Sequence, residues 1–97
     1  MTRQQVLRLL QQARAELLED FGATSLAVFG SVARDQATPT SDVDVLVEFP
    51  GPPTFDQYMG LKLRLEDLLG VRVDLATVTS LRPRVRPSAE AEAIRVA

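Results

Sequence analysis

The chain has 97 residues, of which 45% are hydrophobic and 25% charged, and its net charge is −2, so we expect one small globular domain spanning residues 1–97. It contains no Cys and no His, which excludes disulfide frameworks, thiol or imidazole catalysis and zinc sites built from those ligands; any bound metal must be a hard cation held by oxygen atoms. No apolar run is long enough to span a bilayer, no signal peptide is evident and there is no basic excess, so we expect a cytoplasmic protein without a membrane partner, and nucleic acid is disfavoured as its main partner.

The N-terminal part of the chain predicts a long helix followed by a short strand. Thr2 and Gln5 form a capping box ahead of apolar residues at helical spacing, and Gly22 is placed to end the helix. We therefore expect this helix to run from about residue 3 to residue 20. The mostly apolar residues 24–29 predict a buried strand.

A turn and a loop separate this strand from a second one. Residues 31–34 can form a helical turn, and Pro39 breaks the chain within a loop at 38–40. Residues 41–49 then alternate with period two, which predicts a strand with one apolar face and one acidic face. The apolar face carries Val43, Val45, Val47 and Phe49, and the other face carries Asp42, Asp44 and Leu46.

A proline-rich break at residues 50–53 precedes an amphipathic helix. Residues 54–57 form a second capping box, and Gly70 is placed at the C-terminal end of this helix. Residues 71–76 predict a third strand, and residues 88–95 a short final helix. The apolar stripe of the middle helix, which we expect to lie in the core, comprises Phe55, Tyr58, Leu61, Leu65, Leu68 and Leu69.

This order of elements predicts an α+β (mixed α/β) fold in which a small mixed β-sheet is backed by helices. The short link between the first two strands leaves parallel and antiparallel pairing open. The helix between the second and third strands is long enough for a parallel crossover.

Three Asp residues suggest the chemistry. Asp42 and Asp44 are two positions apart on one strand, so their side chains point the same way, with Cα atoms about 6.5–7 Å apart. Asp74 lies between core residues of the third strand, and if the two strands are neighbours all three carboxylates can face one spot. Carboxylates that close repel one another, and a divalent cation relieves the repulsion. The alternative is a solvated acidic face, although Asp is a poor strand former.

A candidate phosphate site precedes the acids. Gly30 permits close approach of the backbone, the N–H groups that follow at Ser31 can bind an anion, and Arg34 lies one turn further on. A Gly-Ser pair after a strand is by itself usually only a turn. Beside an acidic strand, however, a phosphate site indicates phosphoryl or nucleotidyl transfer.

The stretch Gly30-Ser31-Val32-Ala33-Arg34, followed by Ser41-Asp42-Val43-Asp44 and later by Asp74, resembles the signature of the DNA polymerase beta-like nucleotidyltransferase superfamily. The residues around the motif look like one branch in particular, the minimal nucleotidyltransferases, which are often antitoxins encoded beside HEPN-domain toxins. The resemblance implies a nucleotidyltransferase fold. It also implies that the nucleotide is bound by Gly30, Ser31, Arg34 and Ser41, and that Asp42, Asp44 and Asp74 are catalytic and ligate the metal.

The same resemblance implies an enzyme that uses ATP and two Mg²⁺ ions to transfer AMP to a hydroxyl group on a partner protein, a tyrosine of a HEPN toxin. Asp35 departs from the pattern, because many relatives carry Gly after the arginine. Its negative charge would weaken the binding of an anion.

Two other functions remain open: an antitoxin or binding module that acts by complex formation alone, and a nucleotidyltransferase for a small-molecule hydroxyl. The presence of all three acids argues against the first, and the lack of a separate acceptor-binding domain argues against the second. Arg82, Arg84 and Arg86 form either a solvated connector or a basic arm that touches nucleotide or partner.

Overall fold

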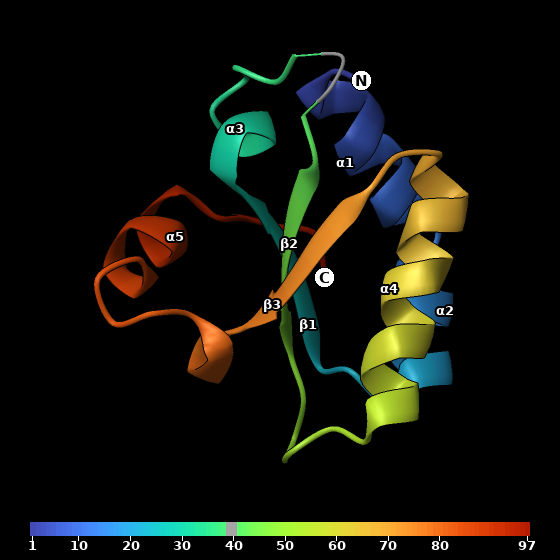
Figure 1. Cartoon of the computed structure of the whole chain (residues 1–97). Coiled ribbons are helices and arrows are strands. Elements are labelled where there is room, and N and C mark those ends of the chain that lie inside the picture. The colour runs from blue at the N-terminus through green and yellow to red at the C-terminus, as the bar shows by residue number, and fades with distance from the viewer. Residues whose placement is uncertain (39–40) are drawn as a thin grey trace.

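The computed structural model describes residues 1–38 and 41–97 and shows a four-stranded sheet with helices on both faces (Figure 1). The strand order is β3-β2-β1-β4. β2 is antiparallel to β1 and parallel to β3, and β4 is antiparallel to β1. The predicted mixed sheet backed by helices is confirmed, with antiparallel pairing of the first two strands. The strands are β1 (Ser25–Phe29), β2 (Val43–Glu48), β3 (Val73–Thr77) and β4 (Ile94–Arg95).

One face of the sheet packs against three helices, α1 (Arg3–Gln12), α2 (Arg14–Phe21) and α4 (Phe55–Leu69), which lie to the right of the strands in Figure 1. The apolar face predicted for β2 points into this layer, and its three valines are almost completely buried. None of the helices in the described residues is long and apolar enough to cross a membrane. The helix residues buried in this core are Val6, Leu10, Leu17, Leu61, Leu65 and Leu69.

Two predictions for this helical layer are wrong. The single helix expected over residues 3–20 is interrupted at Ala13, whose φ of −101° and ψ of 7° depart from helical geometry. Leu10 and Leu17 remain buried on the same side, as their spacing of seven positions requires, and the Leu17 N–H still donates to the Ala13 carbonyl at 2.9 Å, so the break does not turn the apolar face away from the core. Phe55, expected in the core, is 76% exposed, because it occupies the first position of α4 and the buried stripe starts later, at Leu61.

The opposite face of the sheet carries shorter elements: α3 (Gly30–Ala33), the 3₁₀ helix η1 (Val78–Ser80) and α5 (Arg86–Glu92). They lie to the left of the strands in Figure 1. A second, smaller apolar cluster joins η1 and α5 to the sheet and covers only part of this face, whereas Val32 and Ala33 of α3 belong to the main core. The buried residues of the smaller cluster are Phe29, Leu46 and Ala89.

The end of the chain differs from the predicted helix over residues 88–95. The helix begins earlier, at Arg86, with Pro87 in its first turn, where proline is well tolerated, and it ends at Glu92. The chain then pairs with β1: the Val96 N–H donates to the Leu26 carbonyl at 2.8 Å. This pairing satisfies backbone groups along an edge of β1 that would otherwise lack partners in the sheet.

The link from α3 to β2 flanks the predicted site. Asp35 adopts a φ of 59°, in the left-handed region, which Asp tolerates better than most residues. The Thr38 N–H donates to the Ser41 hydroxyl at 2.9 Å. Of the loop predicted at 38–40, Pro39 and Thr40 lie outside the described residues.

Candidate active site

The parallel pairing of β2 and β3 brings Asp44 and Asp74 together. Each is the second residue of its strand, and the two are direct partners in the strand register. Their side chains therefore leave the same face of two strands about 4.8 Å apart. Asp42 is exposed and precedes β2 by one residue, and it belongs to the same face by the alternation of the strand. The three predicted acids thus share one edge of the sheet, with Asp42 at the rim.

Asp44 is the carboxyl group that this arrangement perturbs most. It is half-buried, and burial is the main cause that raises its pKa from 3.8 to about 6. The negative charges of Asp74 and Asp42 and a hydrogen bond with Asp74 raise the pKa further, while the positive charge of Arg34 acts in the opposite direction. A half-buried carboxyl group crowded by two others is the kind of group found at functional sites.

Gly30 shapes the wall of the site next to Asp44. Phe29, its neighbour in the chain, is the register partner of Asp44 on β1, so the backbone of residue 30 passes beside the carboxylate. A Cβ atom placed on Gly30 would lie 2.0 Å from Asp44 Oδ2, and the glycine has a φ of +71°. Both the space and the backbone conformation therefore require glycine here.

Two donors at the predicted phosphate site, the Gly30 N–H and the predicted Arg34 guanidinium, are close together, but a side chain of the protein already binds them. The Gly30 N–H donates to Glu92 Oε1 at 3.0 Å, and Arg34 Nη1 donates to Glu92 Oε2 at 2.8 Å. Arg34 Nε also donates to the side chain of Gln36 at 3.1 Å. Glu92, at the end of α5, was not predicted as a site residue. It lies 62 positions from Gly30, so no local pattern could have revealed the contact.

The two predicted serine residues are placed differently. Within the described residues the Ser31 hydroxyl makes no hydrogen bond, which leaves it free to bind a ligand at the start of α3. The Ser41 hydroxyl instead accepts the Thr38 N–H at 2.9 Å and lies 3.0 Å from the Thr38 hydroxyl, so it closes the loop before β2. The role of both residues in nucleotide binding stays a prediction.

The acidic residues suit a divalent cation in charge but do not form a complete cage. Among residues 1–38 and 41–97, no group of three acidic side chains lies close enough together to hold a metal ion as it stands. Burial is the main cause of the raised pKa of Asp44, and the negative charges of Asp74 and Asp42 add to it, so both lie nearby. A hard cation bound to these oxygens would remove the repulsion, so the donor set fits Mg²⁺, with Asp44 and Asp74 already adjacent.

Tyr58, on α4, contacts the strand that carries Asp74, although the sequence predicted it only as a core residue. Its hydroxyl donates a hydrogen bond to the Leu75 carbonyl, directly after Asp74 on β3. Burial, followed by the negative charge of Asp74, raises the pKa of Tyr58. The contact ties α4 to the strand that carries the third acid.

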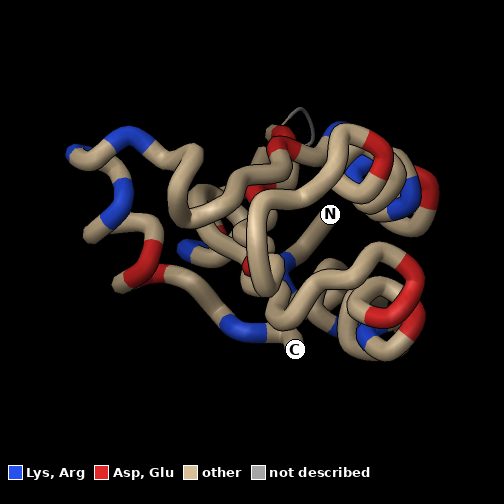
Figure 2. Tube along the Cα trace, turned by 90° about the horizontal axis from the view of Figure 1, so that it is seen from below, with Lys and Arg blue, Asp and Glu red and all other residues tan. Residues whose placement is uncertain are grey.

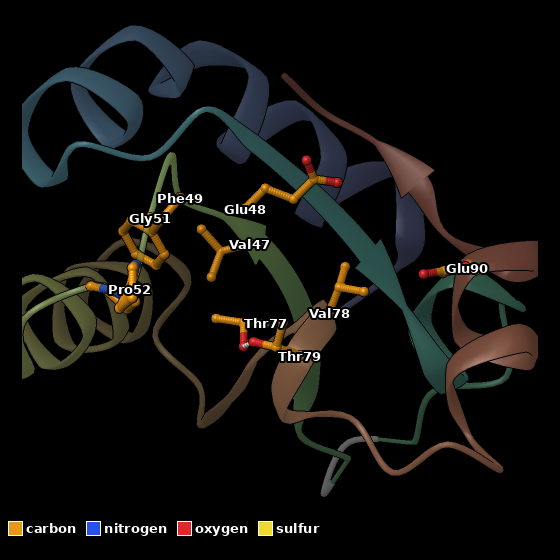
Figure 3. Close-up of a pocket in the computed structure, with 10 residues that line it drawn as sticks. Val47, Glu48, Phe49, Gly51, Pro52, Thr77, Val78, Thr79 and Glu90 are labelled. Carbon is orange, nitrogen blue, oxygen red and sulfur yellow. Dashed lines mark hydrogen bonds between the residues drawn. The ribbon is translucent and has the colours of Figure 1, made fainter.

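A separate pocket of about 660 Å³ lies toward the other end of the sheet (Figure 3). It opens where β2 and β3 finish, whereas the paired acids lie at the start of both strands. No predicted site residue lines it. Its walls include Val47, Glu48, Phe49, Thr77, Val78 and Glu90.

Positive charge is concentrated between η1 and the start of α5, where Arg82 and Arg84 precede the helix and Arg86 is its first residue (Figure 2). Arg82 and Arg84 are exposed. Neither forms an ion pair within the described residues, which fits both a solvated connector and a basic arm.

The chain is similar to proteins of known class over almost its whole length. Residues 10–96 match the family of nucleotidyltransferase domains. The protein adenylyltransferase MntA of Thermococcus cleftensis is 36% identical over 96 residues, which cover 99% of this chain and 97% of that protein.

Solved structures with a similar fold belong to the same class of protein. One that is provisionally described as a minimal nucleotidyltransferase has 44% sequence identity and a TM-score of 0.82, with 97% of this chain and 95% of that chain covered. Another is the tri-AMPylated HEPN toxin of Shewanella oneidensis in complex with MNT antitoxin. It contains a chain with 18% identity and a TM-score of 0.68, with 94% of this chain and 71% of that chain covered, a likeness that concerns the fold alone.

Proposed function

The chain belongs to the nucleotidyltransferase domain family, and we propose that it transfers AMP from ATP to a hydroxyl group of a partner protein. The resemblance to minimal nucleotidyltransferases and the class of enzyme predicted from the sequence are both confirmed. The observation that carries the finer proposal is the adjacency of Asp44 and Asp74 beside the donors of Gly30 and Arg34.

In this proposal the triphosphate of ATP binds at the turn between β1 and α3. The Gly30 N–H, the Ser31 hydroxyl and the Arg34 guanidinium donate hydrogen bonds to phosphate oxygens. The absence of a side chain at Gly30 lets the phosphates approach the Asp44 carboxylate closely. Arg34 is half-exposed, which leaves part of its guanidinium accessible to a ligand.

Asp42, Asp44 and Asp74 would hold two Mg²⁺ ions, which supply positive charge for the attacking and leaving oxygens. Asp74 accepts the proton of the acceptor hydroxyl, whose oxygen attacks the α-phosphorus. The bond to the pyrophosphate oxygen breaks and pyrophosphate leaves. No imidazole base is required, in agreement with a chain that has no His.

The partner that we propose is a HEPN-domain toxin, and the acceptor is a tyrosine hydroxyl of that toxin. Two findings support this. A relative that covers nearly the same length is named a protein adenylyltransferase, and a solved complex with a similar fold pairs an MNT antitoxin with an AMPylated HEPN toxin.

The test is the intact mass of the HEPN-domain protein encoded nearest to this chain, after incubation with ATP and Mg²⁺ and one of three forms of the enzyme. Wild type and Glu48→Gln should both add AMP units, because Glu48 is an exposed residue of the same strand outside the site. Asp44→Asn should add none.

A stable complex with no mass increase in any sample would contradict the proposal and favour a binding module. Modification of a small-molecule hydroxyl, with the protein unchanged, would favour the third function.

A further inference from the structure

Glu92 holds two of the three donors in the proposed nucleotide site, the Gly30 N–H and the Arg34 guanidinium. Its Oε1 accepts the Gly30 N–H at 3.0 Å, and its Oε2 accepts Arg34 Nη1 at 2.8 Å, so one carboxylate spans the two groups. The Arg34 hydrogen bond and, to a smaller degree, the Gly30 N–H hold the pKa of Glu92 below its ordinary value. Glu92 is therefore an anion at neutral pH, bound where an anionic ligand is expected.

A carboxylate and a phosphate group are interchangeable at such a site in chemical terms. Both present two or more negatively charged oxygens to backbone N–H groups and to a guanidinium. The Gly30 N–H is a single donor, and it cannot make a good hydrogen bond to Glu92 and to a phosphate at once. A bound triphosphate would also lie close to the charge of Glu92.

We propose that Glu92 competes with the triphosphate for the Gly30 N–H and the Arg34 guanidinium, and that it thereby sets the affinity of this enzyme for its nucleotide. This inference rests on the proposed function, because it assumes that the triphosphate binds at the Gly30–Arg34 turn. It adds a residue from the C-terminal part of the chain that determines how much ATP is needed to fill the site.

The competition requires only a side-chain movement. Glu92 is the last residue of α5, and its side chain is 26% exposed, so the carboxylate can turn outward into solvent. The backbone on either side stays fixed, because Ala89 is buried in the smaller apolar cluster and Val96 in the main core. Release of Glu92 therefore costs two hydrogen bonds, one of which is also the ion pair with Arg34, but no unfolding of α5.

The experiment compares ATP binding by wild type, Glu92→Gln and Glu90→Gln, measured by isothermal titration calorimetry without a partner protein. Glutamine removes the competing charge at position 92, and we expect affinity to rise roughly three- to tenfold, the effect of one nearby charge close to a protein surface. Glu90 is an exposed neighbour on α5 without a hydrogen bond to the turn, so Glu90→Gln should bind like wild type.

Equal or weaker binding by Glu92→Gln, with an unchanged melting temperature, would overturn the inference and assign Glu92 to holding the donors in place. If that variant does not fold, wild type alone decides the matter by NMR. ATP should shift both the Gly30 amide resonance and the Glu92 carboxyl carbon. A shift of the first without the second, or of neither, would refute the competition.

These outcomes are separate from those of the proposed function. Tighter ATP binding by Glu92→Gln without any AMP transfer to the HEPN protein would leave the competition standing and contradict protein adenylylation. If the wild-type protein transfers AMP to the HEPN protein but Glu92→Gln does not change its ATP affinity, protein adenylylation stands and the competition is contradicted.

Discussion

Replacement of Asp44 by Asn should stabilise the folded protein at pH 7 while it abolishes nucleotidyl transfer. The pKa of Asp44 is raised from 3.8 to about 6, chiefly by burial and by the charges of Asp74 and Asp42. The folded state thus prefers the protonated carboxyl group, and the charged form present at pH 7 destabilises it. Asparagine fills nearly the same space without the charge.

The magnitude follows from the difference between the two pKa values. Each tenfold change in acidity is worth about 1.4 kcal/mol, so a rise from 3.8 to about 6 corresponds to about 3 kcal/mol. Asp44 is only half-buried, and solvent screening reduces this to about 1–2 kcal/mol. For a domain of this size the melting temperature of Asp44→Asn should rise by about 5 °C or more.

The pH dependence has a definite sign. Because the folded-state pKa is the higher one, the stabilising effect of protonation is complete below about pH 4 and is lost as the pH rises through about 6. The advantage of Asp44→Asn over wild type should therefore be largest at pH 7 and nearly vanish at pH 4.

Urea unfolding at several pH values, with Glu48→Gln as the control on the same strand, measures the difference in free energy of unfolding between Asp44→Asn and wild type. A variant that is less stable than wild type at pH 7, or one whose advantage does not shrink on acidification, would refute the electrostatic reasoning.

Gly30→Ala should destabilise the protein by ~2–4 kcal/mol and suppress transfer, because the new methyl group meets Asp44 Oδ2 at 2.0 Å and the backbone has a φ of +71°. A melting curve measures the loss of stability and an activity assay the loss of transfer. A variant as stable as wild type would contradict the packing argument. Tyr58→Phe should cost about 1 kcal/mol in urea unfolding through the lost hydrogen bond to the Leu75 carbonyl, and no change would mean that water replaces the hydroxyl. Asp74→Asn should lower the pKa of Asp44, followed by NMR of the carboxyl carbon, and an unchanged value would show that Asp74 does not contribute to the shift. Mg²⁺ should raise the melting temperature of wild type more than that of Asp44→Asn; equal effects would place the cation elsewhere.

Much of the sheet could be predicted from local patterns. The alternation of residues 41–49 and the caps at Thr2 and Thr54 mark where elements begin and which faces are apolar, and each capping box is present in the structure. These features depend on residues within a few positions of one another, which is the range over which a single sequence is informative.

The remaining features depend on contacts between distant parts of the chain. The strand at Ile94–Arg95 is too short to have a pattern of its own and forms because β1 offers an open edge. The interruption at Ala13 involves neither Gly nor Pro, so no local signal in the sequence marks it. The contact of Glu92 with Gly30 depends on how α5 returns across the sheet.

The pairing of Asp44 with Asp74 depends on the same kind of long-range information. Both acids could be recognised from their strands, but their alignment is fixed by the length of α4 and of the turn after it. From the sequence alone, the three carboxylates converge only if the second and third strands are neighbours in the sheet, and the sequence does not decide whether they are. The structure supplies the register.

The parallel register has a consequence for how the length of this chain can vary. Side chains on a strand alternate between faces, so a shift of β3 by one residue would turn Asp74 into the core and bring a valine or leucine to the site. An insertion or deletion of one residue in the turn from Gly70 to Arg72, between α4 and β3, would therefore separate Asp74 from Asp44. The exposed residues Gly51 and Pro52, before α4, are under no such constraint, because the helix starts at the Thr54 cap whatever the length of the loop before it. Among homologous chains, insertions should accumulate in the proline-rich loop and be absent from the turn that leads into β3.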